Sequence, residues 1–176
     1  ADKRPATLVQ ELDTALDGAV ERVRALGDFE AKPGTSCLLY ADKAVGARRI
    51  LLVGLGERKA ITTDVLRKAA AAAATRAVDL KAKSAALSLH TDLPAGVQPE
   101  AAGQAVAEGA FFGAFRYDEF MSEAKKKRPA KLTATLVETD ARVLRALRKG
   151  VATGAVTGEA QNYARLIANR PANVIN

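Results

Sequence analysis

The sequence predicts an α/β fold, in which helices flank a largely parallel or mixed sheet within one layered domain. Two observations lead to this class. Short β-type runs alternate with helix-type segments along the chain, and 38 of the 176 residues are alanine, a composition typical of closely packed helices. A length of 176 residues suits one domain with its own core, and neither a linker nor a repeat of fixed period divides it.

The first segment, residues 8–26, is predicted to form one amphipathic helix. Its apolar residues recur at spacings of three and four, with charged residues between them. Gly18 weakens this helix at its middle, and Gly27 suits the left-handed residue that follows a helix end. A turn at 32–34 then leads into a predicted strand at 36–40.

The next elements follow the order strand, glycine loop, helix, strand. Residues 49–55 are Arg-Ile-Leu-Leu-Val-Gly-Leu, which is apolar after the first residue and has the length expected of a central strand buried on both faces. Thr62 or Thr63 is expected to cap a helix over residues 64–80. Alternating residues at 85–90 then predict another strand.

Pro99 suits the first turn of a helix that runs to residue 112. Residues 131–137 predict the next strand. Asp140 is expected to cap a long helix that continues to about residue 168, where Pro171 ends it. This helix leads out of the domain.

Side chains that commonly carry catalysis are scarce, because the chain has one histidine, one cysteine and no tryptophan. These counts exclude an internal disulfide and a Cys/His zinc site, and any triad that needs histidine depends on His90. We expect His90 to sit at a strand end facing solvent or a neighbouring subunit. We expect Cys37 to be an inert, buried hydrophobic side chain.

The net charge of +7 and the pI of about 9.7 raise the question of nucleic-acid binding. Lys125, Lys126, Lys127 and Arg128 form the densest basic run, within residues 116–149 that hold ten basic and five acidic side chains. This run favours a solvated loop between a helix and a strand. The alternative is a surface that grips phosphates, with a salt-dependent affinity.

Five aromatic residues precede the basic run, and two of them, Phe112 and Phe115, fall at helical spacing. A platform on which nucleic-acid bases stack would need such rings on the surface. We instead expect Phe112 and Phe115 to be core anchors.

Two groups of glycines have a structural and a functional interpretation. Gly54 and Gly56 lie between a strand and a helix, but the third glycine of a dinucleotide site and the phosphate-loop ending are absent, so turn glycines are favoured. The alternative there is a nucleotide ligand, since glycine lets the backbone approach a phosphate at a helix N-terminus. Gly150, Gly154 and Gly158 recur every four residues along the long helix. Because glycine costs a helix about 1 kcal/mol per position, we expect another helix or a subunit to pack directly on that stripe.

No apolar run approaches the roughly 18 residues that a membrane span needs, since the longest candidate is polyalanine at 69–74 between charged residues. No secretion signal precedes the first helix. We therefore expect a cytoplasmic protein that makes no membrane contact.

Several stretches together resemble the leucyl aminopeptidases of peptidase family M17. They are Val-Gly-Leu-Gly at 53–56 with the alanine-rich helix after it, Phe-Arg-Tyr-Asp at 115–118, and above all Ala-Arg-Leu-Ile-Ala-Asn-Arg-Pro-Ala-Asn-Val at 164–174. The last stretch is the most specific, and Arg165, Asn169, Pro171 and Asn173 carry its pattern. The resemblance covers nearly the whole chain from about residue 8. One difference is that the family usually has a strand before the first helix, where this sequence has only residues 1–6.

The resemblance implies that residues 1–176 are one N-terminal, non-catalytic domain with a macro-domain-like fold, and that residues 160–176 form the junction to a catalytic domain absent from this chain. In the family, that second domain holds two divalent metal ions, Mn or Zn, and the catalytic lysine and arginine. We therefore predict no catalytic residue, metal ligand or cofactor in this chain. The resemblance also implies a homo-hexamer as the full-length protein, and DNA binding in some bacterial relatives.

The leading hypothesis is thus a structural and assembly domain of a metal-dependent exopeptidase that releases N-terminal residues from peptides. The chain alone is expected to be inactive. The alternative hypothesis is a nucleic-acid-binding module that uses the basic loop at 125–128.

Overall fold

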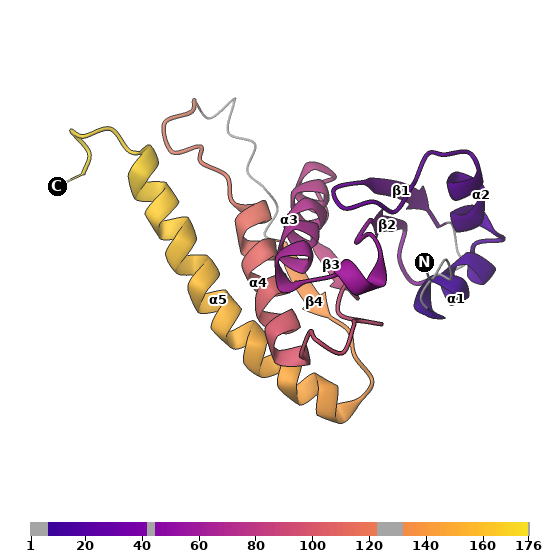
Figure 1. The fold of residues 1–176 in the computed structure, drawn as a ribbon. Coiled ribbons are helices and arrows are strands. Elements are labelled where there is room, and N and C mark those ends of the chain that lie inside the picture. The colour runs from indigo at the N-terminus through magenta and orange to yellow at the C-terminus, as the bar shows by residue number, and fades with distance from the viewer. Residues whose placement is uncertain (1–6, 42–44, 123–131, 176) are drawn as a thin grey trace.

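The structure of the chain, a computed structural model, describes residues 7–41, 45–122 and 132–175. Three helices, α3, α4 and α5, lie side by side over a small parallel sheet, and α5 lies outermost (Figure 1). Two short helices, α1 and α2, gather with an antiparallel strand pair at the opposite end of the molecule. The predicted α/β class with a long final helix is confirmed.

The first helical segment is broken in two, as α1 (Thr7–Ala15) and α2 (Ala19–Ala25). Asp17 and Gly18 between them take left-handed backbone angles, with φ of 51° and 75°. Gly18 stands at the start of α2 and has no side chain to cap it, so Asp13 Oδ1 accepts the backbone N–H groups of Val20 at 2.8 Å and Glu21 at 3.1 Å. The prediction of one continuous helix over 8–26 was wrong, whereas the left-handed Gly27, with φ of 81°, is confirmed.

The first sheet pairs β1 (Ser36–Tyr40) with β2 (Arg49–Val53) in antiparallel register, from Ser36 opposite Val53 to Tyr40 opposite Arg49. Within the described residues β2 has no second strand beside it, and Leu52 is its one buried residue. The expectation of a central strand buried on both faces was therefore wrong. The hydrophobic cluster behind this sheet consists of Leu16, Val20, Phe29, Ala41 and Leu52, and half-buried Cys37 packs against it.

The second sheet pairs β3 (Ser84–Leu87) with β4 (Thr133–Leu136) in parallel. Both strands are shorter than predicted. Parallel and antiparallel pairing are both present, as in a mixed sheet, but they occur in two separate two-stranded sheets in the part of the chain that is described.

The remaining elements match their predicted positions closely. They are the helices α3 (Thr63–Asp79), α4 (Pro99–Ala114) and α5 (Ala141–Asn169). A 3₁₀ turn that was not predicted, η1 (Arg58–Ala60), precedes α3. The predicted caps are present: Thr62 Oγ1 accepts the N–H of Val65, and Asp140 Oδ1 accepts the N–H groups of Arg142 and Val143. Pro99 occupies the first turn of α4.

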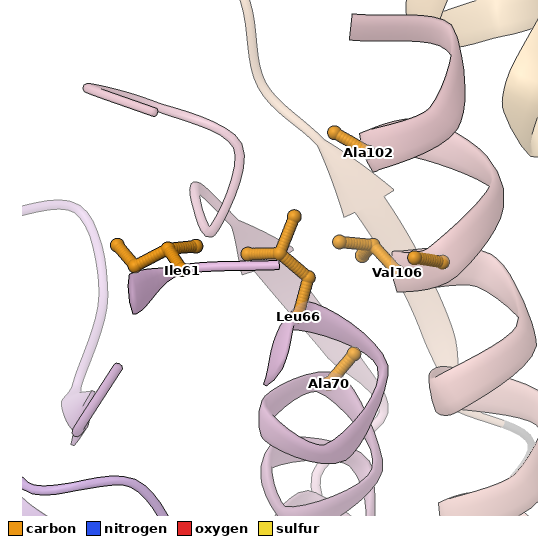
Figure 2. Packing of buried hydrophobic residues seen from close by; sticks show 6 residues of the cluster. Ile61, Leu66, Ala70, Ala102 and Val106 are labelled. Carbon is orange, nitrogen blue, oxygen red and sulfur yellow. The ribbon is translucent and has the colours of Figure 1, made fainter. Parts of the chain in front are cut away.

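The main core lies between α3, α4 and the second sheet. Leu66 and Ala70 of α3 face Val106 and Ala102 of α4, with Ile61 at the edge of the cluster (Figure 2). Half-buried Leu87 of β3 and Leu136 of β4 close the cluster from the sheet side. Because alanines supply much of this interface, the helices can approach closely, as the composition predicts.

Glycines set the helix spacing on both sides of α4. A β-carbon at Gly150 or Gly154 of α5 would overlap the carbonyl oxygens of Glu100 or Gln104 on α4, and one at Gly158 would lie 2.6 Å from Phe111 Cβ. On the opposite side, Gly109 and Gly113 of α4 press against backbone atoms of α3 in the same way. The helix expected on the glycine stripe of α5 is therefore α4.

Candidate functional site at the end of the long helix

The residues of the predicted junction gather where α5 ends. Arg165 and Asn169 lie in the last turns of α5, and Pro171 and Asn173 follow in an exposed segment. The four basic residues of the predicted solvated loop, for which phosphate binding is the alternative, lie outside the described residues: Lys125, Lys126, Lys127 and Arg128.

Arg165 joins α5 to the C-terminal end of α4. Its guanidinium carbon lies 4.2 Å from the ring centres of both Phe112 and Phe115, so the cation contacts two aromatic rings. The same group donates hydrogen bonds to the Phe112 carbonyl at 3.1 Å and to Asn162 Oδ1 at 3.2 Å. A planar guanidinium suits this site, because it can stack and donate in its own plane at once.

This contact corrects the expectation that Phe112 and Phe115 are core anchors. Phe112 is 44% exposed and Phe115 is half-buried, and neither belongs to a hydrophobic cluster of the core. Helical spacing alone could not separate a ring in the core from a ring that stacks on an arginine at the surface.

A second link, between Arg170 and Glu119, holds the segment after α4 against the end of α5. The guanidinium donates to both carboxylate oxygens, at 2.8 and 2.9 Å, which is the paired geometry of a strong charge-assisted contact. The hydrogen bonds from Arg170 lower the pKa of Glu119. Sequence reasoning missed this pair, since 51 residues separate the partners and no local pattern joins them.

Two asparagines complete the helix end. Asn162 Nδ2 donates to the Phe111 carbonyl at 2.9 Å, and Asn169 Nδ2 donates to the Arg165 carbonyl at 2.7 Å. The N–H of Val174 donates to the Pro171 carbonyl, so the exposed segment after the helix forms a turn. The junction pattern is therefore a structured helix end whose side chains bind within the chain.

His90 lies buried, and the expectation that it faces solvent was wrong. Its side chain is 1% exposed, and Nε2 lies 3.3 Å from Glu138 Oε2, although the contact lacks hydrogen-bond geometry. Glu138 Oε1 accepts the N–H groups of Thr139 and Asp140, just before α5. Burial lowers the pKa of His90, and the nearby Glu138 carboxylate partly opposes that shift.

The glycine loop at 54–56 lies against the backbone of residues 31–35. The N–H groups of Gly54 and Gly56 donate to the carbonyls of Thr35 and Ala31, both at 2.9 Å, so neither is free to bind a phosphate. A β-carbon at Gly54 would overlap the Lys32 carbonyl, and Gly56 has a φ of 79°. The preferred structural role of these glycines is confirmed, although they serve a close contact with residues 31–35 and not a turn.

Across residues 7–41, 45–122 and 132–175, no group of three or more His, Cys, Asp or Glu side chains is placed to hold a metal ion. Among the helices in these ranges, none combines the length and apolar character of a membrane crossing.

Comparison with known proteins identifies the domain. The family model of the cytosol aminopeptidase family, N-terminal domain, matches residues 1–124. A probable cytosol aminopeptidase of Acidobacterium capsulatum is 37% identical over 163 residues, which are 92% of this chain and 31% of that protein. One from Syntrophotalea carbinolica is 30% identical over 98% of this chain and 35% of its own length.

Solved structures agree. The bottromycin maturation enzyme BotP in complex with Mn superposes with a TM-score of 0.70 at 32% identity, over 90% of this chain and 30% of the enzyme. A mutant of tomato leucine aminopeptidase superposes with a TM-score of 0.62 at 29% identity, over 84% of this chain and 29% of the enzyme.

The fold and its helix end thus define an α/β domain of the aminopeptidase type. The chain belongs to the cytosol aminopeptidase family and corresponds to the N-terminal domain of that family. It spans about a third of the length of the curated relatives that it matches.

Proposed function

We propose that residues 1–176 form one non-catalytic domain that supports the structure and assembly of a longer, metal-dependent aminopeptidase, with residues 160–176 as the junction. The match of residues 1–124 to the N-terminal domain of the family carries this proposal. The structured helix end around Arg165 and Arg170 supports the assignment of the junction.

The longer protein, on this proposal, is a cytoplasmic homo-hexamer that releases N-terminal residues from peptides with two divalent ions, Mn or Zn. The Mn complex of one solved relative supports metal dependence. The described residues of this chain do not fit such a centre, because a pair of metal ions needs several converging carboxylates. We place the metal ligands and the catalytic residues in the remaining part of the longer protein.

An aminopeptidase assay tests the proposal. The purified chain, supplied with Mn²⁺ or Zn²⁺, should not release the reporter group from a leucyl p-nitroanilide. The Acidobacterium capsulatum relative, assayed beside it, should turn the substrate over only when metal is present. Metal-dependent turnover that co-elutes with the pure chain would overturn the non-catalytic assignment.

The alternative is a nucleic-acid-binding module that uses the basic loop Lys125–Arg128. Exposed Arg142, Arg145 and Arg148 at the start of α5 add positive charge to the segment that follows this loop. On this alternative, affinity for duplex DNA should fall by about 0.9 log units per log unit of salt for each phosphate contact. Replacing Lys125, Lys126 and Lys127 by alanine should flatten that slope, and an unchanged slope or no binding at low salt rejects the alternative.

A further inference from the structure

The hydrophobic core of the described residues consists of two clusters that share no side chain. The first draws only on residues 9–52, and the second draws only on residues 55–136. We call residues 7–53 the N-terminal lobe and residues 57–175 the helix body, each taken over its described positions. The lobe, with α1, α2, β1 and β2, lies on the side of α3 away from α5 (Figure 1). The boundary between the two parts is the glycine connection at 54–56.

The polar contacts mostly stay within one part. Among the described residues, both partners of every ion pair belong to the same part, as with Arg24 and Glu21 in the lobe. One hydrogen bond that does cross runs from Arg49 Nη1 of β2 to the Leu80 carbonyl at 3.0 Å, and it is exposed to solvent. An exposed hydrogen bond is readily exchanged for one to water, so it holds the two parts together only weakly.

Apolar packing across the boundary is also incomplete. β2 lies beside α3, yet no side chain of β2 belongs to the cluster of the helix body. A cleft of about 400 Å³ is lined by Thr7, Leu8 and Glu11 of α1 on the lobe and by Thr91 and Asp92 on the helix body. Protein interiors leave few voids larger than a water molecule. The cleft therefore shows that α1 does not pack tightly on this part of the helix body.

The lobe has the weaker structure of the two parts. Its helices α1 and α2 have nine and seven residues, and isolated helices shorter than about 12 residues are marginal in water. A two-stranded sheet such as β1 with β2 is also marginal by itself. The largest fully buried side chains all lie in the helix body: Leu66, Leu147 and Val106. Segments with few deeply buried apolar contacts open most easily, so the lobe should open before the helix body does.

The glycine connection separates the contacts of the two parts. The N–H groups of Gly54 and Gly56 donate to carbonyls of the lobe, whereas the Leu55 side chain packs on the cluster of the helix body. Gly56 has a φ of 79°, which glycine adopts without strain. The chain can therefore change direction at this connection while Leu55 keeps its place on the helix body.

We propose that the N-terminal lobe is a separate cooperative unit, which unfolds and refolds as a whole while the helix body stays folded. The contacts between α4 and α5 lie within the helix body, so the long helix keeps its place when the lobe opens. The domain therefore carries a part that opens independently, on the side of α3 away from α5 (Figure 1).

Hydrogen exchange of the whole chain in low concentrations of urea tests this inference. Amides of residues 36–40 and 49–53 should exchange through one common opening, at least about tenfold faster than the slowest amides of α3 and α4. Leu52→Ala removes a buried side chain of the lobe, and it should speed exchange in the lobe by at least about a further tenfold. The amides of α3 and α4 should stay within twofold of the unmodified chain. The matched variant Val106→Ala, in the core of the helix body, should reverse this pattern.

Circular dichroism covers the case in which Leu52→Ala leaves the lobe without structure. The helical signal of α3, α4 and α5 should then persist, and their amides should keep their protection. Loss of the whole helical signal in this variant would overturn the proposal, because the chain would then unfold as one unit. The proposal is equally wrong if either variant speeds exchange alike in both parts, or if lobe amides exchange as slowly as the slowest amides of α3 and α4.

Discussion

Arg165 and Phe112 lie with the guanidinium carbon 4.2 Å above the ring centre, and the Phe115 ring contacts the same cation at the same distance. Fifty-three residues separate Arg165 from Phe112 along the chain. The contact therefore fixes the end of α5 to the end of α4.

Replacing Arg165 by lysine should loosen this helix end although the charge is kept. An ammonium cannot stack flat on two rings while it donates to the Phe112 carbonyl and Asn162, so we expect a loss of about 1 kcal/mol in the free energy of unfolding. Urea denaturation measures the loss, and hydrogen exchange should be faster at residues 160–169. Arg148→Lys, an exposed position on the same helix, is the control. Equal losses in the two variants would show that the stacking contributes nothing.

Replacing Gly150 by alanine should destabilise the fold. Alanine is the better helix former by about 1 kcal/mol, but its β-carbon would overlap the Glu100 carbonyl oxygen and lie 2.8 Å from the backbone nitrogen of Gln104. Overpacking of this kind costs about 1 to 3 kcal/mol, so the net effect should lower the melting temperature. Gly96→Ala is the matched control, because no atom lies within 4 Å of a β-carbon at residue 96. A stabilised Gly150→Ala variant would contradict the close helix contact.

Stability should fall as the pH drops below about 6.5, because of His90. Burial lowers the pKa of His90 in the folded state, so the unfolded chain binds the proton more readily in this range. The free energy of unfolding should fall by at most about 1.4 kcal/mol per pH unit. This fall is confined to the range between the pKa of His90 in the unfolded chain and its lower pKa in the folded chain. His90→Gln should remove the slope between pH 7 and pH 5. Protonation of Glu138 affects stability only at a lower pH, because the pKa of its carboxyl group lies below the usual value.

The sequence contains one histidine, so proton NMR reads this titration without overlap. Glu138→Gln should lower the pKa of His90 further, because the carboxylate that favours the protonated ring is gone. A His90 pKa at or above 6.5 in the unmodified chain would contradict its buried position.

Asp13→Ala should separate α1 from α2. The carboxylate caps the first free N–H groups of α2 from seven residues upstream, and loss of such a cap costs about 1 kcal/mol. Asp13→Asn keeps an acceptor oxygen and should retain most of the stability. Thermal unfolding of the two variants compares them directly, and an alanine variant as stable as the asparagine variant would show that the cap is dispensable.

Local signals predicted much of this fold. Thr62, Pro99 and Asp140 mark helix starts by chemistry that acts within three residues, and all three stand at helix starts in the structure. The glycine stripe of α5 predicted a close neighbour because its helix-propensity cost needs compensation from packing. The junction at residues 160–176 stays a prediction, since the family model matches only residues 1–124.

The remaining features depend on contacts between distant segments. The same apolar run can form a central strand or one strand of a two-stranded sheet. The position of β2 in a two-stranded sheet therefore could not be predicted from residues 49–55. The break at Asp17 is supported by Asp13 from the preceding helix, and periodicity alone continues through it. Similarly, the burial of His90 follows from the pairing of β3 with β4, which brings Glu138 to its ring.

The glycine contacts near the start of α5 also have a mechanical consequence. With 29 residues at 1.5 Å per residue, α5 is about 43 Å long. A tilt of about 5° at its base would therefore move its far end by about 4 Å, comparable to the 4.2 Å between Arg165 and its two rings. The absence of a methyl group at residue 150 therefore helps to determine where the far end of α5 lies, and Gly154 and Gly158 hold the helix to α4 further along.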